Sequence, residues 1–305
     1  MSCAPVALFV YNRPWHTRQT VAALLANPES AQTPLYIFSD APKNAAASKV
    51  VAEVRSYIRK IDGFKSVAII EREVNFGLAR SIIDGVTQLC EEHGRVIVLE
   101  DDLEISPHFL AYMNAGLTRY ENEEKVMQIA GYMFPVALDL QEDALLLPFT
   151  SSWGWATWKR AWQYFDASGS GYQRLVEDKG LRHAFDLNGN YGYFQMLESQ
   201  LRGETDSWAI RWYLSVFLAR GLVLYPKITL VRNLGFDGSG INCVASTYKG
   251  NQIEKDFLVV AMPHQIAASD HYVELLQKLP KPKLNVRAVL NRLRNTITAF
   301  YEKIN

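Results

Sequence analysis

Short apolar runs alternate with stretches of helical spacing over the first hundred residues of the chain. The four runs are VALFV at 6–10, LYIF at 35–38, VAII at 67–70 and VIVL at 96–99. Between them, apolar residues recur at intervals of three and four, as at Ile82, Val86 and Leu89, and the same pattern puts Leu25 and Leu78 on inward helix faces. Buried strands that alternate with amphipathic helices predict an α/β fold with a mostly parallel sheet sandwiched by helices.

Three consecutive acids follow the fourth run directly. Glu100, Asp101 and Asp102 come at the carboxyl end of the predicted strand, which is where parallel sheets bind their ligands. Ser106 is a good N-cap and Pro107 a good first helical residue, so a helix is predicted to begin there. Adjacent carboxylates repel one another, and burying an unpaired charge is costly. We therefore expect a positive partner beside this turn.

Past Ala130 the chain becomes rich in aromatic residues. The segment SSWGWATWKRAWQYFD at 151–166 holds four tryptophans, and NGNYGYFQ and ETDSWAIRWYL mix further aromatic residues with acids. A strand, a proline turn, a second short strand and a glycine-rich loop are predicted over 221–242. Burial in the core is the simpler interpretation for most of the tryptophans.

Composition and charge narrow the class of protein. The chain has 305 residues, 49% of them hydrophobic, and 32 basic residues balance 32 acidic ones. A formal charge of zero gives no support to a protein that coats nucleic acid. The three cysteines have no metal-ligand spacing, the N-terminal sequence lacks the features of a secretory signal, and no window reaches the roughly 20 apolar residues of a spanning helix. A soluble, cytoplasmic protein is expected.

The last segment, LNVRAVLNRLRNTITAFYEKIN, has the pattern of a basic amphipathic helix. Leu290, Leu293, Ile297 and Phe300 fall on one face, and basic residues lie elsewhere. Such a helix binds the surface of an anionic membrane, or it docks on its own domain or on a second subunit. Periodicity does not separate peripheral membrane contact, at the inner face of the cell membrane, from a homo-oligomer contact.

The acidic triplet has three chemical uses. It holds a divalent metal, supplies a general acid or base, or bonds to loop amides and nearby cations. Hard oxygen ligands without nearby His or Cys suit Mn²⁺ or Mg²⁺, which complete their shells with substrate phosphates. After the first strand comes YNRPWHT, which is neither a dinucleotide fingerprint nor a P-loop. A nucleotide diphosphate held through metal is therefore expected, which counts against NAD enzymes, kinases and sugar nucleotidyltransferases.

Several motifs in order resemble glycosyltransferases of the GT-A fold. These motifs are YNRP, FSD, NFGLA, EDD, the tryptophan-rich segment, DSW and FDGSG, between about 6 and 242. The chain resembles most closely the eukaryotic N-acetylglucosaminyltransferase I family and its bacterial sugar-transferase relatives. The resemblance implies a GT-A (Rossmann-like) domain over 1–245, with a donor half at about 1–130 and an acceptor half at about 131–245. The extension at 246–305 carries the amphipathic helix.

The resemblance also implies roles for individual residues in the donor half. Asp102 corresponds to the direct protein ligand of Mn²⁺, and Glu100 and Asp101 to the acids that bind the sugar and ribose of the donor. Arg13 and Asp40 match the residues that hold the uracil end of a UDP-sugar. Arg13 has an alternative role, a simple ion pair with Asp40 or with a surface acid.

Further implied positions lie along the chain. The NFGLA motif places Asn75 at the donor, and Trp153 and Gly154, with Trp155, suit a platform for a sugar face. Asp206 of ETDSW corresponds to the catalytic base. The family has two adjacent acids there, whereas here Ser207 follows. Capping the helix that begins at SWAIRWYL is an ordinary alternative role for Asp206.

The glycine-rich loop GFDGSGIN resembles the loop that closes over a bound donor. Relatives often carry a His near its end, where this chain has Asn242, so a role for that His does not carry over.

The function that the resemblance implies is metal-dependent, inverting transfer of a hexose or N-acetylhexosamine. The donor is expected to be a UDP-sugar, and the acceptor a hydroxyl of a glycan or lipid-linked glycan in bacterial surface polysaccharide synthesis. Two other classes use the same features. A metal-dependent nucleotide-sugar hydrolase or phosphotransfer enzyme would release diphosphate without an acceptor. A non-catalytic glycan-binding protein would bind glycan without a metal.

Overall fold

The structure, a computed structural model, describes residues 3–238 and 253–279. Its strands are β1 (Val6–Val10), β2 (Pro34–Ser39), β3 (Ser66–Glu71), β4 (Arg95–Glu100), β5 (Leu103–Ile105), β6 (Val126–Ala130), β7 (Ala144–Leu147), β8 (Trp155–Trp158), β9 (Leu222–Pro226) and β10 (Val231–Asn233). Its α-helices are α1 (Pro14–Leu25), α2 (Ala45–Ile58), α3 (Leu78–His93), α4 (Phe109–Arg119), α5 (Lys159–Trp162), α6 (Tyr172–Glu177), α7 (Lys179–Phe185), α8 (Tyr193–Leu201), α9 (Trp208–Leu218) and α10 (Tyr272–Lys278). Two 3₁₀ turns, η1 (Pro28–Gln32) and η2 (Gly235–Asp237), complete the described elements.

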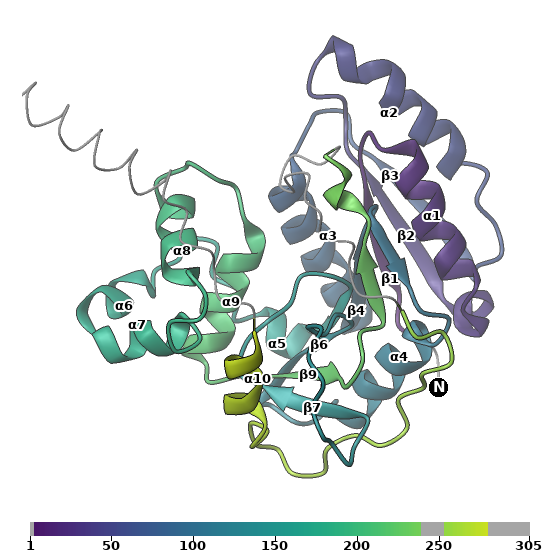
Figure 1. Cartoon of the computed structure of the whole chain (residues 1–305). Helices are drawn as coiled ribbons and strands as arrows, with labels where there is room; N and C mark the ends of the chain where they lie inside the picture. The colour runs from purple at the N-terminus through teal and green to yellow at the C-terminus, as the bar shows by residue number, and fades with distance from the viewer. Residues whose placement is uncertain (1–2, 239–252, 280–305) are drawn as a thin grey trace, which may run out of the picture.

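One sheet of eight strands forms the centre of the molecule, in the order β3-β2-β1-β4-β8-β6-β9-β7 (Figure 1). The pairs β2–β3, β1–β2, β1–β4 and β6–β9 are parallel, and the pairs β4–β8, β6–β8 and β7–β9 are antiparallel. Strands β8 and β7 thus run against the other six, whose carboxyl ends meet at one edge. The predicted α/β class with a mostly parallel sheet between helices is confirmed.

The sheet crosses the predicted boundary between donor and acceptor halves. Strand β8, from the tryptophan-rich segment, lies between β4 and β6. Its register pairs Trp155 with Val98 and with Ala130. The two predicted halves therefore share one hydrogen-bonded sheet.

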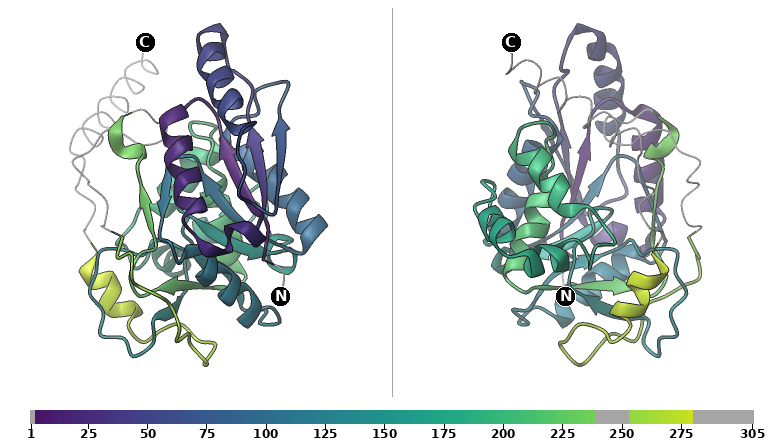
Figure 2. Two further views of the ribbon diagram at one scale, coloured as in Figure 1. Left: turned by 90° about the vertical axis from the view of Figure 1, so that its right-hand side faces the viewer. Right: turned by 60° about the vertical axis from the view of Figure 1, so that its left-hand side comes forward.

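Helices cover both faces of this sheet. Helices α1 and α2 pack together on one face, and α3 packs with α5 and α9 on the other (Figure 1). The group α6–α8 lies beside α9, away from the strands, and Figure 2 shows α10 at the end of the molecule opposite α2. Gly85 lets α3 approach the sheet, because a Cβ there would lie 2.8 Å from the ring of Phe9.

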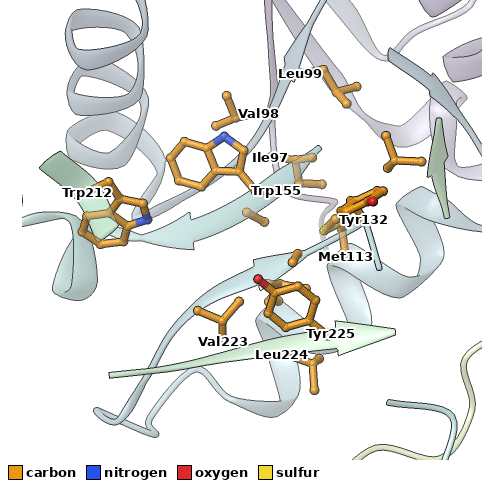
Figure 3. Close-up of a cluster of buried hydrophobic side chains, with 14 of the residues drawn as sticks. Ile97, Val98, Leu99, Met113, Tyr132, Trp155, Trp212, Val223, Leu224 and Tyr225 are labelled. Carbon is orange, nitrogen blue, oxygen red and sulfur yellow. The ribbon is translucent and has the colours of Figure 1, made fainter. Parts of the chain in front are cut away.

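A cluster of aromatic and aliphatic side chains fills the space around β8 and β9 (Figure 3). Trp155 and Trp212 are each 1% exposed, and Trp155 stacks on Trp208 at 5.0 Å between ring centroids. Trp212 Nε1 donates a hydrogen bond of 2.6 Å to the buried Gln128 side chain. Most of the tryptophans are core residues, as predicted, and they fix α9 against the sheet.

Three local predictions are wrong. The helix after the acidic turn begins at Phe109 rather than at Pro107, because the Ser106 hydroxyl accepts a bond of 3.2 Å from His108 N and closes a turn there. Leu25 and Leu78 are 41% and 36% exposed. They are the last residue of α1 and the first of α3, where a helix reaches past the surface that it covers.

In the two ranges that the structure describes, no helix has the length and apolarity needed to cross a bilayer. The predicted amphipathic helix near the C-terminus lies outside the described residues, as does the second half of the glycine-rich loop, 239–242, with Asn242.

Candidate active site

The acidic triplet forms the turn between β4 and β5. Thr20 Oγ1 of α1 donates a hydrogen bond of 2.8 Å to the Asp101 carbonyl, and Leu234 N donates one of 2.8 Å to the Asp102 carbonyl. Asp101 and Asp102 are 3% and 5% exposed. The turn is therefore fixed from two sides, by α1 and by the segment that follows β10.

The antiparallel pair β5–β10 brings the start of the glycine-rich loop to the acids. Leu103 pairs with Asn233, and Asn233 Oδ1 accepts a hydrogen bond of 2.7 Å from Gly235 N. A Cβ on Gly235 would lie only 2.3 Å from Asp102 Oδ2. The backbone of η2 thus packs directly on the Asp102 carboxylate, and only glycine fits without a shift.

Arg13 is the positive partner of the turn. It precedes α1 and reaches Asp102 Oδ2 through Nη1 at 2.9 Å, while its Nη2 donates to Asp101 Oδ1. The alternative of an ion pair with Asp40 or a surface acid is wrong, because both partners are buried acids of the triplet. The contact of Arg13 with a nucleotide stays a prediction.

One guanidinium faces three carboxylates, and the pKa values reflect the excess negative charge. Burial raises the pKa of Glu100, the neighbouring Asp102 and Asp101 raise it further, and Arg13 opposes them. Burial also raises the pKa of Asp101, against the effect of Arg13. Burial alone would lower the pKa of Arg13, but the two aspartates outweigh it and the pKa rises. The three acids of the turn therefore share Arg13 as their positive partner among the described residues.

A metal held at Asp102 would have few protein ligands among the described residues. Within residues 3–238 and 253–279, no three His, Cys, Asp or Glu side chains converge on a common metal position. In the same ranges, the hydrogen bond that Arg13 gives to the Asp102 carboxylate goes to Oδ2, and Oδ1 accepts none. A hard cation with few protein ligands takes its remaining ligands from phosphate and water. Asp102 therefore suits Mn²⁺ or Mg²⁺ together with a diphosphate.

Asp40 and Asn75 are brought together at the same edge of the sheet. The Asp40 carboxylate accepts hydrogen bonds from Ala41 N at 2.9 Å, Phe76 N at 2.8 Å and Gly77 N at 2.9 Å. Asn75 Nδ2 donates a further bond of 2.9 Å to it. Four accepted bonds use the ordinary capacity of a carboxylate. Asp40 therefore fixes the loop that follows β3, and its contact with a nucleotide stays a prediction.

Trp153 lies at the start of β8, at the edge of the sheet that carries the acids. It is half-buried, and its ring makes edge contacts with Tyr132 at 4.5 Å and with Phe236 of η2 at 5.6 Å. Trp155 is not part of a platform, because it is buried in the core. The predicted platform therefore reduces to Trp153 with its aromatic neighbours.

Backbone conformation and packing explain why residue 154 is a glycine. Its φ is +62°, and its carbonyl accepts a hydrogen bond of 2.7 Å from Gly131 N. A Cβ there would lie 2.9 Å from Val231 Cγ2. Both features require glycine, so its presence follows from packing, and a donor contact stays a prediction.

Asp206 lies on the surface just before α9. Its side chain is 65% exposed and pairs with Arg211 Nη2 at 3.2 Å. The capping alternative is wrong, because Ser207 is the N-cap and its hydroxyl accepts a bond of 3.4 Å from Ile210 N. Asp206 therefore does not cap α9, and its role as a base stays a prediction.

A cleft of about 640 Å³ lies between α3 and α9. Its lining consists of Arg80, Ile83, Asp84, Thr87, Gln88, Asp206 and Arg211. Among the described residues, the acids of the triplet are not part of this lining. The structure thus brings Asp206 next to residues of α3, in a cleft that the acidic turn does not line.

Other residues of the site were not identified from the sequence. Thr20 is a buried polar residue on the inward face of α1, a pattern that signals a hydrogen bond to a neighbouring element. His16 is 5% exposed, and its Nε2 lies 3.2 Å from Asp237 Oδ2. The two atoms do not have the geometry of a hydrogen bond. Arg80 occupies an exposed helix position, and no local pattern distinguishes it.

Comparison with known proteins supports the motifs of the first half. Residues 1–134 match the sequence model of the GNT-I family. The alpha-1,3-mannosyl-glycoprotein 2-beta-N-acetylglucosaminyltransferase of Arabidopsis thaliana is 28% identical over 141 residues, 43% of this chain and 31% of that protein. The chain therefore spans about a third of the length of this curated relative.

Two solved structures match this chain with low sequence identity and with TM-scores below 0.5. S. aureus TarS 1–349 is 12% identical with a TM-score of 0.40, over 74% of this chain and 60% of that one. A mannosyltransferase from Pyrobaculum calidifontis, solved in complex with GDP-Man and Mn²⁺, is 11% identical with a TM-score of 0.38, over 71% of this chain and 73% of that one.

The matched range contains YNRP, FSD, NFGLA and EDD, with all three acids of the turn, and it ends before the tryptophan-rich segment, DSW and FDGSG. The resemblance to the N-acetylglucosaminyltransferase I family is therefore confirmed over residues 1–134.

Proposed function

We propose that this chain is a metal-dependent, inverting glycosyltransferase of the GT-A type. It transfers a hexose or N-acetylhexosamine from a nucleotide-diphosphate donor, a UDP-sugar, to a hydroxyl of a glycan or lipid-linked glycan. The observation that carries the proposal is the turn Glu100–Asp102, three carboxylates that one guanidinium neutralises only in part. This turn lies within the range that matches the GNT-I family.

Asp102 would hold Mn²⁺ or Mg²⁺ through Oδ1, while Arg13 keeps Oδ2 in place. When bound, the cation supplies charge stabilisation for the departing diphosphate, worth several kcal/mol by order of magnitude. Glu100 and Asp101 bind the sugar and ribose hydroxyls of the donor. The bonds from Thr20 and Leu234 hold the turn in one position, so that little reorganisation is needed when the donor binds.

The remaining donor residues surround the same edge of the sheet. Asp40 orders the loop that carries Asn75, and Arg13 and Asn75 contact the nucleotide from β1 and β3. Trp153 presents a half-exposed ring next to Gly154, where a sugar face stacks against it. Each of these contacts uses a side chain whose position is set by a hydrogen bond or a ring contact within the protein.

Asp206 takes the proton from the attacking hydroxyl of the acceptor at a carboxylate oxygen. A positioned base contributes roughly 10²–10⁴-fold to the rate. Asp206 pairs with Arg211 at 3.2 Å, and its exposure leaves it accessible to an acceptor. One displacement from the face opposite the leaving group inverts the anomeric centre. Synthesis of a bacterial surface glycan, in the cytoplasm or at the inner face of the membrane, is the expected setting.

The test is a screen of nucleotide sugars for turnover with Mn²⁺ and with EDTA. We expect release of nucleotide diphosphate from one donor in the presence of Mn²⁺, stimulated by a glycan acceptor. Asp206→Asn should lose transfer by at least roughly 10²-fold, whereas Glu204→Gln, an exposed acid two residues earlier, should keep it.

Each rival class gives a different result in this screen. Full turnover without any effect of acceptor indicates a hydrolase. Glycan binding with no turnover and no response to EDTA indicates a non-catalytic binding protein.

A further inference from the structure

Four charged residues line the cleft between α3 and α9, namely Arg80, Arg211, Asp84 and Asp206. Asp84 forms an ion pair with Arg72, and Asp206 forms one with Arg211 at 3.2 Å. Arg80 also lines the cleft, and among the residues that the structure describes no acid lies within ion-pair distance of it. Within the described part of the chain, Arg80 is therefore the arginine of this cleft that forms no ion pair.

The Arg80 guanidinium has a defined position although it is exposed. It lies over the ring of Phe76 at 3.8 Å from the ring centroid, and Arg72 lies over the same ring at 4.5 Å. Phe76 is itself fixed, since its backbone N–H donates to Asp40 at 2.8 Å. A guanidinium that stacks through its face keeps its N–H edge available for a planar anion, and little side-chain entropy remains to be lost.

The rest of the lining suits a carbohydrate. Thr87 Oγ1 accepts a hydrogen bond of 2.9 Å from Trp162, which fixes the hydroxyl. Gln88, whose amide nitrogen donates to Glu92 at 2.9 Å, also lines the cleft with its amide group. Ile83 adds an apolar patch between them. Hydroxyl and amide groups around a small apolar surface match the mixed character of a sugar ring.

From this arrangement we infer that the acceptor of the reaction is an anionic glycan, whose carboxylate or phosphate binds Arg80 while the attacking hydroxyl faces Asp206. The inference rests on the proposed function, because it takes Asp206 as the base. It adds a specificity-determining residue, Arg80, and a substrate class, a glycan with a negatively charged substituent. A second source of the same chemistry, the donor diphosphate, is distinguished by the test.

The first arm of the test measures binding without any reaction. D-Glucuronate and D-glucose differ at C6, carboxylate against hydroxymethyl, and their binding to the full chain is followed by NMR titration. We expect D-glucuronate to bind about tenfold more tightly, the contribution of one charge-assisted pair. Arg80→Gln should remove this preference and Arg80→Lys should keep part of it. Arg182→Gln is the matched control, since Arg182 also stacks on a ring, Phe194 at 5.0 Å.

The second arm measures UDP binding in the presence of Mn²⁺ with the same variants. We expect Arg80→Gln to bind UDP as the unchanged protein does. A loss of UDP affinity as large as the loss of D-glucuronate affinity would assign Arg80 to the donor and overturn the inference. Equal binding of D-glucuronate and D-glucose to the unchanged protein would overturn it as well.

The two arms separate the inference from the proposed function. A protein that turns over a UDP-sugar but shows no preference for D-glucuronate leaves the proposed function in place and removes the anionic acceptor. A preference for D-glucuronate that depends on Arg80, in a protein that turns over no donor, keeps the anion site and removes the transferase. Thermal melting of each variant checks that the fold is intact.

Discussion

At the scale of single residues, the acidic turn is enclosed by groups that leave little freedom. Arg13 bridges two of its carboxylates, Thr20 and Leu234 hold its backbone, and Gly235 packs against Asp102. A cation site of this kind depends on the position of one carboxylate, so a small displacement has a large effect on affinity.

Gly235→Ala should disturb this enclosure. The added Cβ would meet Asp102 Oδ2 at 2.3 Å, so the carboxylate or η2 has to move. We expect a loss of Mn²⁺-dependent donor binding of at least about tenfold and a loss of stability of about 1–3 kcal/mol. Isothermal titration and thermal melting measure the two effects.

Gly192→Ala is the matched control for this change. Gly192 has φ −93°, and a Cβ there meets no atom within 4 Å. Unchanged donor binding in Gly235→Ala would show that the packing of η2 on Asp102 is not needed for the site.

At the scale of elements, the segment between α5 and α6 is organised by one carboxylate. Asp166 accepts hydrogen bonds from the backbone N–H and the hydroxyl of both Ser168 and Ser170, over 2.5–2.8 Å. Burial alone would raise the pKa of Asp166, but these bonds outweigh it and lower the pKa to about 2. Because the pKa is lower in the folded than in the unfolded state, the ionised form stabilises the fold.

Asp166→Asn should therefore destabilise the protein in a pH-dependent way. We expect the free energy of unfolding to fall by about 1 kcal/mol at pH 7. The amide nitrogen of Asn cannot accept a hydrogen bond, and it would face the N–H and O–H donors of one of the two serines. The difference between the two proteins should persist above pH 4 and shrink as the pH falls to 2, where the carboxyl is protonated in the unfolded state and about half protonated in the folded state. Urea unfolding from pH 7 to pH 2 measures it, and a constant difference across this range would contradict the assignment.

The sequence predicted elements well where the signal is local. A continuous apolar run such as VIVL has no stable alternative to a buried strand, and β4 follows it. The start of α4 was misplaced because Ser106 has two uses, as a helix cap or as a turn former, and the choice depends on its contact with Leu230, whose carbonyl accepts Ser106 N. Such a contact between distant segments leaves no trace in local spacing.

At the scale of the whole molecule, the order of strands was beyond the sequence. The insertion of β8 between β4 and β6 depends on how Trp155, Trp208 and Trp212 pack, not on the residues of β8 alone. The acids of the turn were predicted because strand and charge lie next to each other in the chain. Their pairing with Arg13 was not, since 89 positions separate Arg13 from Asp102.

Cys90 on α3 is a buried thiol whose reactivity tests the packing of the core. The thiol is 1% exposed, and burial, with Glu91 adding to it against Lys159, raises its pKa to about 12. In a Cys3→Ser, Cys243→Ser background, iodoacetamide at pH 8 should label Cys90 at least about a thousandfold more slowly than a free thiol, because so little thiolate is present. Labelling should accelerate in urea together with loss of the fold, and rapid labelling of the native protein would contradict the packing of α3.

The most direct test of the account is isothermal titration of Mn²⁺ and UDP into the unchanged protein, Asp102→Asn and Glu104→Gln. Glu104 is the matched control, an acid two residues further on that pairs with Arg232. If Asp102 holds the cation, UDP binds only with Mn²⁺, Asp102→Asn weakens this binding by at least roughly 100-fold, and Glu104→Gln leaves it within about twofold. Equal Mn²⁺-dependent binding of UDP by the unchanged protein and by Asp102→Asn would contradict this role of Asp102.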